Sequence, residues 1–250
     1  MPKSTPNSAL RLEVGILKLS SKVFRAAYDY IIRLLEMNPQ RLPKICLTRL
    51  MHFHRSSNAA PEYNWVAQIN IFLQKVNMSN LLESASAEDW KSMRILAFTR
   101  FDRHLKFQDI LAHSDMSHMN CPIPRSLDYG TADYILCENN FSFVKTLAQA
   151  RLSTRYSLRF CIKGLIYKIN QHEQCMTCNM HALETLQHIL VDCPTYEAVR
   201  DHYLRFLLNV ASSINANPLV ILNCSDTFSI RMIYFYIVNC LRLRSSLLNE

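Results

Sequence analysis

Glycine is scarce in this chain: only three glycines occur in 250 residues. Rossmann turns, P-loops and hairpin-rich barrels all depend on glycine, because they need backbone at positive φ or a close approach to phosphate. Hydrophobic residues make up 49% and charged residues 19% of the chain, which is typical of a globular protein and argues against wholesale disorder. The composition therefore favours an all-α fold.

Long apolar segments are also missing. The first residues lack the apolar stretch of a signal peptide, and the longest apolar run, 232–241, is about half as long as a membrane helix. Nine cysteines without a secretory signal are better explained by metal ligands and reduced core thiols than by disulfides. We expect an intracellular protein, in nucleus or cytoplasm, that is neither secreted nor transmembrane.

Familiar catalytic motifs are absent from the sequence. It contains no GxSxG and no HExxH, and its carboxylates are scattered rather than paired. A Cys/His hydrolase stays open as an alternative, since its catalytic partners need only be close in space. We expect a protein without catalytic residues, not an enzyme.

The formal net charge of +8 is unevenly distributed. Residues 1–55 carry a net +7 and residues 151–170 a net +5 with no acid among them, whereas the rest of the chain is slightly acidic. Two basic blocks on a near-neutral background favour a polyanionic partner. In the N-terminal block the cations are spread over amphipathic segments, so a packed helical surface is the default explanation there.

Helical periodicity recurs along most of the chain. Charged and apolar residues alternate at three- and four-residue steps, which predicts helices at 21–37, 41–54, 61–76, 89–113, 139–160, 194–210 and 226–248. Ser, Asp, Pro and Gly concentrate between the fourth and fifth of these segments. We therefore expect a helical connector-like domain at 1–113, a linker at 114–133 and a helical C-terminal domain at 134–250.

The stretch QCMTCNMHALETLQHILVDCP, residues 174–194, concentrates candidate metal ligands. A CxxC turn, Cys175 and Cys178, can direct two thiolates at one point, and His188 and Cys193 complete a Cys₃His set. Four protein ligands are what a structural Zn²⁺ site requires, with no position left for water. This predicts a zinc knuckle within 174–200.

Two alternatives to this ligand set stay open. The cysteines could be buried thiols and His188 a surface residue, because free cysteine is often buried. His172 and His181 are rival ligands, although His181 lies so close to Cys178 in sequence that binding the same ion would strain the turn.

Cations precede the knuckle at four-residue intervals: Arg151, Arg155, Arg159 and Lys163. In a helix they would form one ladder suited to backbone phosphates, with Tyr156 and Phe160 between them as aromatic residues that could stack on bases. The plain alternative is a solvated helical face. Arg200, after the last ligand, could pack against the knuckle or reach a phosphate.

The knuckle region resembles a known family. CxxC, Glu184-Thr185, His188, Cys193-Pro194, Tyr196 and Arg200 occur in the order found in the zinc-binding segment near the C-terminus of non-LTR (LINE-type) retrotransposon reverse transcriptases. A looser similarity to the helical region upstream of that segment extends over most of the chain. The YxDD-type carboxylates of the polymerase and the Pro-Asp of the restriction-like endonuclease are missing. The resemblance implies a part of such a protein without its catalytic centres.

Together these patterns predict a non-catalytic protein that binds RNA or DNA. The metal ligands would be Cys175, Cys178, His188 and Cys193, and the nucleic-acid contacts would be Arg151, Arg155, Arg159, Lys163 and Arg200. The competing interpretations are a zinc-stapled helical module that binds protein, and a decayed element fragment without activity.

Overall fold

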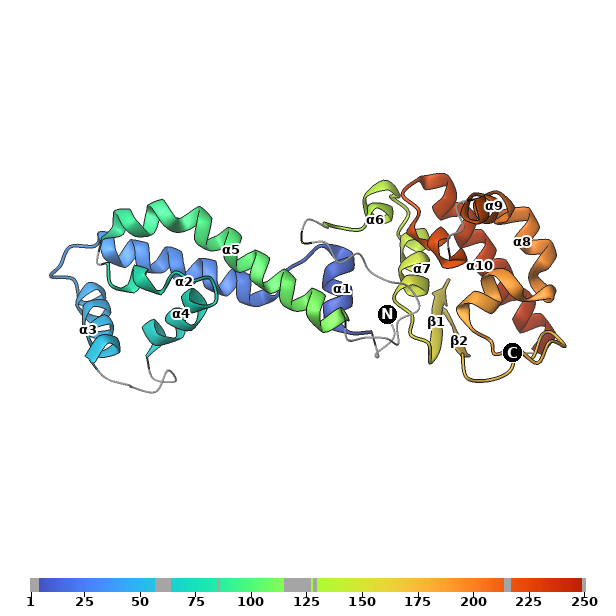
Figure 1. Ribbon diagram of the computed structural model, residues 1–250, viewed down its shortest axis with the longest axis horizontal. Coiled ribbons are helices and arrows are strands. Elements are labelled where there is room, and N and C mark those ends of the chain that lie inside the picture. The colour runs from blue at the N-terminus through green and yellow to red at the C-terminus, as the bar shows by residue number, and fades with distance from the viewer. Residues whose placement is uncertain are drawn as a thin grey trace. The chain divides into compact units, whose positions relative to one another are not determined.

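The computed structural model describes residues 5–56, 64–84, 86–114, 127, 130–213 and 217–248. Helices dominate these residues, which confirms the all-α prediction in part. No helix among them is both long and apolar enough to cross a membrane. With η marking 3₁₀ or π turns, the elements are α1 (Asn7–Val14), α2 (Leu19–Glu36), α3 (Leu42–Ser56), α4 (Trp65–Gln74), η2 (Ser79–Leu82), α5 (Ala87–Ser114), α6 (Asp133–Cys137), α7 (Phe141–Arg151), β1 (Ser157–Ile162), β2 (Leu165–Asn170), η3 (His188–Asp192), η4 (Pro194–Tyr196), α8 (Glu197–Tyr203), α9 (Arg205–Ser213), η5 (Pro218–Asn223) and α10 (Thr227–Leu248) (Figure 1).

The chain forms two compact units. Residues 16–111 make up one, which we call the inserted unit, and residues 1–15 and 112–250 make up the other, which we call the knuckle unit. The boundary differs from the predicted domains, because the first fifteen residues belong with the C-terminal part of the chain. Most of the predicted linker, 114–133, lies outside the described residues.

Buried polar contacts attach α1 to the knuckle unit. Glu13 is fully buried and forms an ion pair with Arg151 at the end of α7, whose side chain is 4% exposed. The Glu13 carbonyl also accepts a hydrogen bond of 2.9 Å from the Ala132 amide. Gly15 then turns the chain at a φ of +69°, where a Cβ would lie 2.6 Å from the Thr131 backbone nitrogen, so a residue without a side chain is needed.

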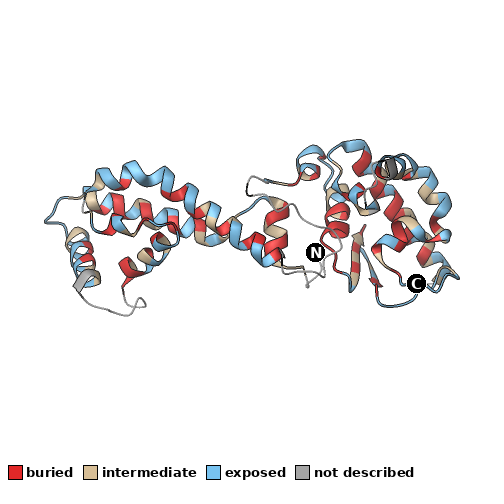
Figure 2. Ribbon diagram, in the orientation of Figure 1, coloured by how far each residue is buried: buried red, intermediate tan, exposed pale blue. Residues whose placement is uncertain are grey.

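The core of the inserted unit is aromatic. Phe24 and Tyr28 lie one turn apart on α2 and pack against Trp90 and Phe101 of α5, as the helical spacing predicts. The Tyr28 hydroxyl donates a 2.7 Å hydrogen bond to the Trp90 carbonyl, so its polar end is satisfied within the core. Figure 2 shows the buried positions of this unit on the sides of its helices that face one another.

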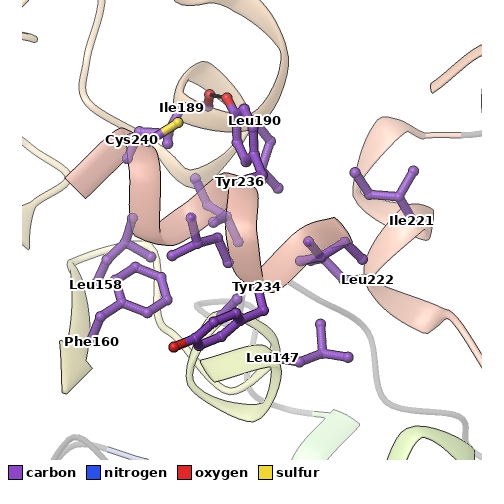
Figure 3. Close-up of a cluster of buried hydrophobic side chains, with 14 of the residues drawn as sticks. Leu147, Leu158, Phe160, Ile189, Leu190, Ile221, Leu222, Tyr234, Tyr236 and Cys240 are labelled. Atoms are coloured by element: carbon purple, nitrogen blue, oxygen red, sulfur yellow. Dashed lines mark hydrogen bonds between the residues drawn. The ribbon is translucent and has the colours of Figure 1, made fainter. Parts of the chain in front are cut away.

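The core of the knuckle unit is built around α10. Side chains from α7, β1, η3 and η5 gather along this helix, among them Leu147, Leu158, Leu190 and Leu222 (Figure 3). The knuckle segment thus shares one hydrophobic core with the hairpin and the last helix. Burial of this common surface couples the knuckle's position to both.

A β-hairpin corrects the all-α prediction. The helix predicted for 139–160 ends at Arg151, and β1 and β2 pair antiparallel with Arg159 opposite Lys168. Lys163 and Gly164 form the two-residue turn with φ of +49° and +86°, the conformation a tight hairpin requires. Every second side chain of β1 is buried, at Leu158, Phe160 and Ile162. In a strand these three side chains lie on one face, whereas in a helix they would point in different directions.

We expect the buried ion pair between Arg151 and Glu13 to be essential to the stability of the knuckle unit. Replacing Arg151 with alanine leaves the Glu13 carboxylate buried without its partner, so chemical denaturation should show a loss of about 3–5 kcal/mol in the free energy of unfolding. Arg205→Ala, at an exposed position in α9, serves as the control and should change it by less than about 0.5 kcal/mol. Equal effects of the two changes would contradict this assignment.

Candidate metal centre

The four predicted ligands lie together in the structure. The ligand atoms of Cys175, Cys178, His188 and Cys193 all fall within 4.8 Å of one another, and this group could hold a metal ion. Three of the residues are buried and Cys178 is half-buried. Neither rival histidine belongs to this group: His181 is exposed on the loop, and the His172 ring lies beside Tyr156.

A short antiparallel pairing positions the CxxC turn. The amide of Cys175 donates to the Ala182 carbonyl at 2.8 Å, and the amide of Glu184 donates to the Glu173 carbonyl at 3.0 Å. The intervening loop closes with His181 at a φ of +53°. This pairing fixes both ends of the loop and places the thiols of Cys175 and Cys178 near His188 and Cys193.

A π turn supplies the other two ligands. The His188 amide donates to the Thr185 hydroxyl at 3.0 Å, and the Cys193 amide donates to the His188 carbonyl at 2.8 Å, a five-residue bond. Five residues of a regular α-helix turn the chain by roughly 500°, which would leave these two side chains about 140° apart. The wider turn brings them toward the same side, and π turns of this kind are frequent at functional sites.

Two of the distances between ligand atoms are close to those around a tetrahedral ion. Bonds of about 2.3 Å to sulfur and about 2.0 Å to nitrogen place tetrahedral ligand atoms about 3.5–3.8 Å apart. The Sγ atoms of Cys175 and Cys193 are 4.0 Å apart, and Cys178 Sγ lies 3.4 Å from His188 Nε2. Three sulfur donors and one imidazole favour a borderline or soft metal over Mg²⁺ or Ca²⁺.

Burial favours the neutral forms of Cys178 and His188. It raises the pKa of the Cys178 thiol to about 11, an effect to which the neighbouring Cys175 and Cys193 add. Burial lowers the pKa of His188, so its imidazole is neutral at neutral pH and available as a ligand. A metal ion must therefore displace thiol protons when it binds.

Hydroxyl groups surround the thiols. Thr177, inside the CxxC turn, has its Oγ1 3.1 Å from the sulfur of Cys175 and donates to the Tyr196 hydroxyl at 3.4 Å. Thr195 in turn donates to the Thr177 carbonyl. These bonds connect the CxxC turn to η4, on the far side of the last ligand, and hold the two halves of the knuckle in register.

Arg200 holds the knuckle's backbone. Its Nε donates to the Leu190 carbonyl at 3.0 Å and its Nη2 to the Cys193 carbonyl at 2.6 Å. Both carbonyls lie at the end of η3, and that of Cys193 also accepts from the Tyr196 amide at 3.3 Å. The guanidinium thus binds the backbone around Cys193, so Arg200 has a structural role that needs no phosphate contact.

The knuckle is fixed to α10 by buried polar contacts. Arg244 binds Glu184 through two hydrogen bonds of 2.8 and 3.2 Å, and the Tyr236 hydroxyl donates to the Ile189 carbonyl. Tyr236 and Arg244 lie eight residues apart, on one face of α10. The segment before the π turn and the π turn itself are therefore tied to the same helix.

The predicted cationic ladder does not form, because only its first member is helical. Arg151 is buried against Glu13, and its Nη1 donates to the Leu222 carbonyl at 2.9 Å, so it is not placed for a nucleic-acid phosphate. Arg155 precedes the hairpin, Arg159 lies in β1 and Lys163 in the turn. Phe160 is a core residue, 3% exposed.

The hairpin reveals a basic residue that the ladder interpretation missed. Lys168 is exposed and lies directly opposite Arg159 on the face turned away from the core. A spacing of four residues places side chains on one face of a helix and also on one face of a strand. The positions of the cations alone therefore do not distinguish a helix from a strand. In the sequence, the hairpin is indicated by apolar residues at every second position, Leu158, Phe160 and Ile162, followed by a Lys-Gly pair.

Comparison with protein-family models, with curated proteins and with solved structures finds no match to this chain.

We expect metal binding by this group to weaken as the pH falls. In the apo state the Cys178 thiol, with a pKa of about 11, holds its proton throughout the neutral range, whereas the metal-bound state requires the thiolate. The bound state thus carries fewer protons, so its stability rises with pH. Titration with a chromophoric metal indicator from pH 8 to about pH 5 should show a progressive loss of affinity. An affinity that does not change over this range would contradict thiolate coordination.

Proposed function

We propose that this chain binds nucleic acid through the outer face of its β-hairpin, and that a structural Zn²⁺ in the Cys₃His group holds the neighbouring fold in register. The proposal is of a binding protein without a catalytic centre of its own. Four protein ligands would complete the tetrahedral shell of Zn²⁺ and leave no position for an activated water.

One observation carries the nucleic-acid proposal: Arg159 and Lys168 are direct cross-strand neighbours with no acid on the hairpin to offset them. Like charges directly opposite each other destabilise a strand pair. In the described part of the chain neither residue has an ion-pair partner. A polyanion across this face would remove the repulsion and gain affinity by releasing counterions.

Further groups around the hairpin favour the same ligand. Lys163 is exposed at the turn and Arg155 is exposed just before β1. Tyr156 is 54% exposed at the base of the hairpin, and its ring centroid lies 5.2 Å from that of His172. Cations combined with an accessible aromatic ring are typical of proteins that bind single-stranded nucleic acid.

The proposal that the metal is zinc rests on the donor set. Thiolate and imidazole together suit a borderline cation, and a closed Cys₃His shell is a common structural zinc site. The similarity to the retrotransposon zinc segment adds support, because the shared residues outside the ligand set also have structural roles here. Glu184 anchors the knuckle to α10, the Thr185 hydroxyl accepts from the amide of His188 at the start of the π turn, and Arg200 binds the carbonyl of Cys193.

A second candidate function, binding of an extended peptide, is favoured by the outer edge of β2, which pairs with no further strand among the described residues. The Tyr156–Gln171 pair is hydrogen-bonded, with the Gln171 amide donating to the Tyr156 carbonyl at 3.0 Å. By antiparallel alternation the backbone groups of Ile166 and Lys168 therefore point away from β1. They border a groove of about 350 Å³ beside the end of α10. An added strand could pair there.

The two candidates predict different effects of substitution. Arg159→Ala combined with Lys168→Ala should weaken binding of single-stranded RNA and reduce the slope of log Kd against log salt by about 1.4, or about 0.7 for each lost phosphate contact. Fluorescence anisotropy across a salt series measures both quantities. Lys168→Ala alone should give half of the change in slope.

Two controls separate the candidates. Arg205→Ala removes an exposed cation from α9, outside the hairpin, and should leave the slope unchanged. Ile166→Pro removes an outward amide from the edge strand, where proline is tolerated, so it should block strand addition yet leave RNA binding intact. An unchanged affinity and slope in the double variant would exclude the hairpin as the nucleic-acid surface.

A further inference from the structure

A cationic groove of about 400 Å³ opens on the inserted unit, separate from the hairpin and the metal centre. Three elements form it: the start of α2, the end of α4 and the middle of α5. Its polar and aromatic lining includes Lys18, Ser20, Phe72, Lys75, His104 and Gln108. The volume lies in the range of small-molecule sites.

Positive charge dominates this groove. Burial, followed by the charges of Lys75 and Lys18, lowers the pKa of His104. Two acids of the same stretch of α5 already contact cations. Asp102 binds Arg25, and Asp109 lies 3.4 Å from Lys18 Nζ. The charge of Lys75 has no such partner in the described part of the chain, so the groove keeps a net positive potential.

Aromatic side chains hold Lys75 and His104 in place. The rings of Phe101 and His104 are nearly parallel, 21° apart, with centroids separated by 6.5 Å. Lys75 Nζ lies 5.5 Å from the centroid of Phe72. These contacts limit the orientations of His104 and Lys75 at the rim, which reduces the entropy lost when a ligand binds.

The start of α2 adds to the positive potential. Lys18 occupies the N-cap position, no side chain caps the helix, and its first turn contains no acid. A cation at the positive end of an eighteen-residue helix is the reverse of the favourable arrangement. An anion in the groove would be favoured by this helix end and would offset the charge of Lys75, whereas the charge of Lys18 already has Asp109 beside it.

We propose that this groove binds the phosphate group of a phosphorylated ligand, either a mononucleotide or a nucleic-acid backbone. The lysines supply charge, Ser20 and Gln108 supply neutral hydrogen-bonding groups, and His104 becomes a cationic donor once the anion is present. The inference does not depend on the proposed function, because every lining residue belongs to the inserted unit.

Titration of the full-length protein with inorganic phosphate, at constant ionic strength, tests the proposal. The readout is the pKa of the His104 imidazole, followed by NMR and assigned by comparison with His104→Gln. Bound phosphate dianion should raise this pKa with a saturating dependence on concentration. Lys75→Glu should weaken phosphate binding at least tenfold. Arg49→Glu makes the same charge change on α3, outside the groove, and should preserve binding.

Competition then identifies the source of the phosphate. Displacement by adenosine monophosphate alone assigns the groove to a small ligand, and displacement by a single-stranded RNA oligomer assigns it to the nucleic-acid backbone. The proposal is overturned if phosphate leaves the pKa of His104 unchanged, or if Lys75→Glu and wild type respond equally. Phosphate that neither competitor displaces also overturns it, since the groove would then hold an adventitious ion only.

Discussion

Three thiols and one imidazole share a space less than 5 Å across, and the knuckle unit is arranged around that constraint. A short strand pairing brings the first two cysteines to the point, and a π turn brings the histidine and the last cysteine. Thiol and imidazole side chains gain little from being so close to one another. A cation among them converts the crowding into coordination bonds, which contribute directly to folding free energy in small metal-stabilised folds.

The position of the cluster is determined by α10 and by buried charge pairs. Arg244 with Glu184 and Arg151 with Glu13 each join segments that are far apart in sequence. Buried pairs of this kind add little net stability, but breaking one is destabilising, so they specify one arrangement. The hairpin lies against the same core, and through it the basic outer face is held in a fixed relation to the knuckle.

The sequence predicted the features that depend on local spacing. The ligand set was identifiable because CxxC, histidine and cysteine occur within nineteen positions, and α2 and α5 because their apolar faces repeat at helical intervals. The hairpin was missed because cations four residues apart satisfy a helix and a strand alike. The buried state of Arg151 could not be predicted, since its partner Glu13 lies 138 residues earlier. The groove at Lys75 likewise requires three elements that only the fold brings together.

Metal analysis of the purified protein tests the central claim most directly, by comparing wild type with Cys178→Ser and with Cys161→Ser. Cys161 is a half-buried thiol of the same unit that lies outside the ligand group, so it provides a matched control. We expect about one zinc ion per chain in wild type and in Cys161→Ser, and loss of zinc together with helical order in Cys178→Ser. A wild-type protein that is metal-free and fully folded would contradict it.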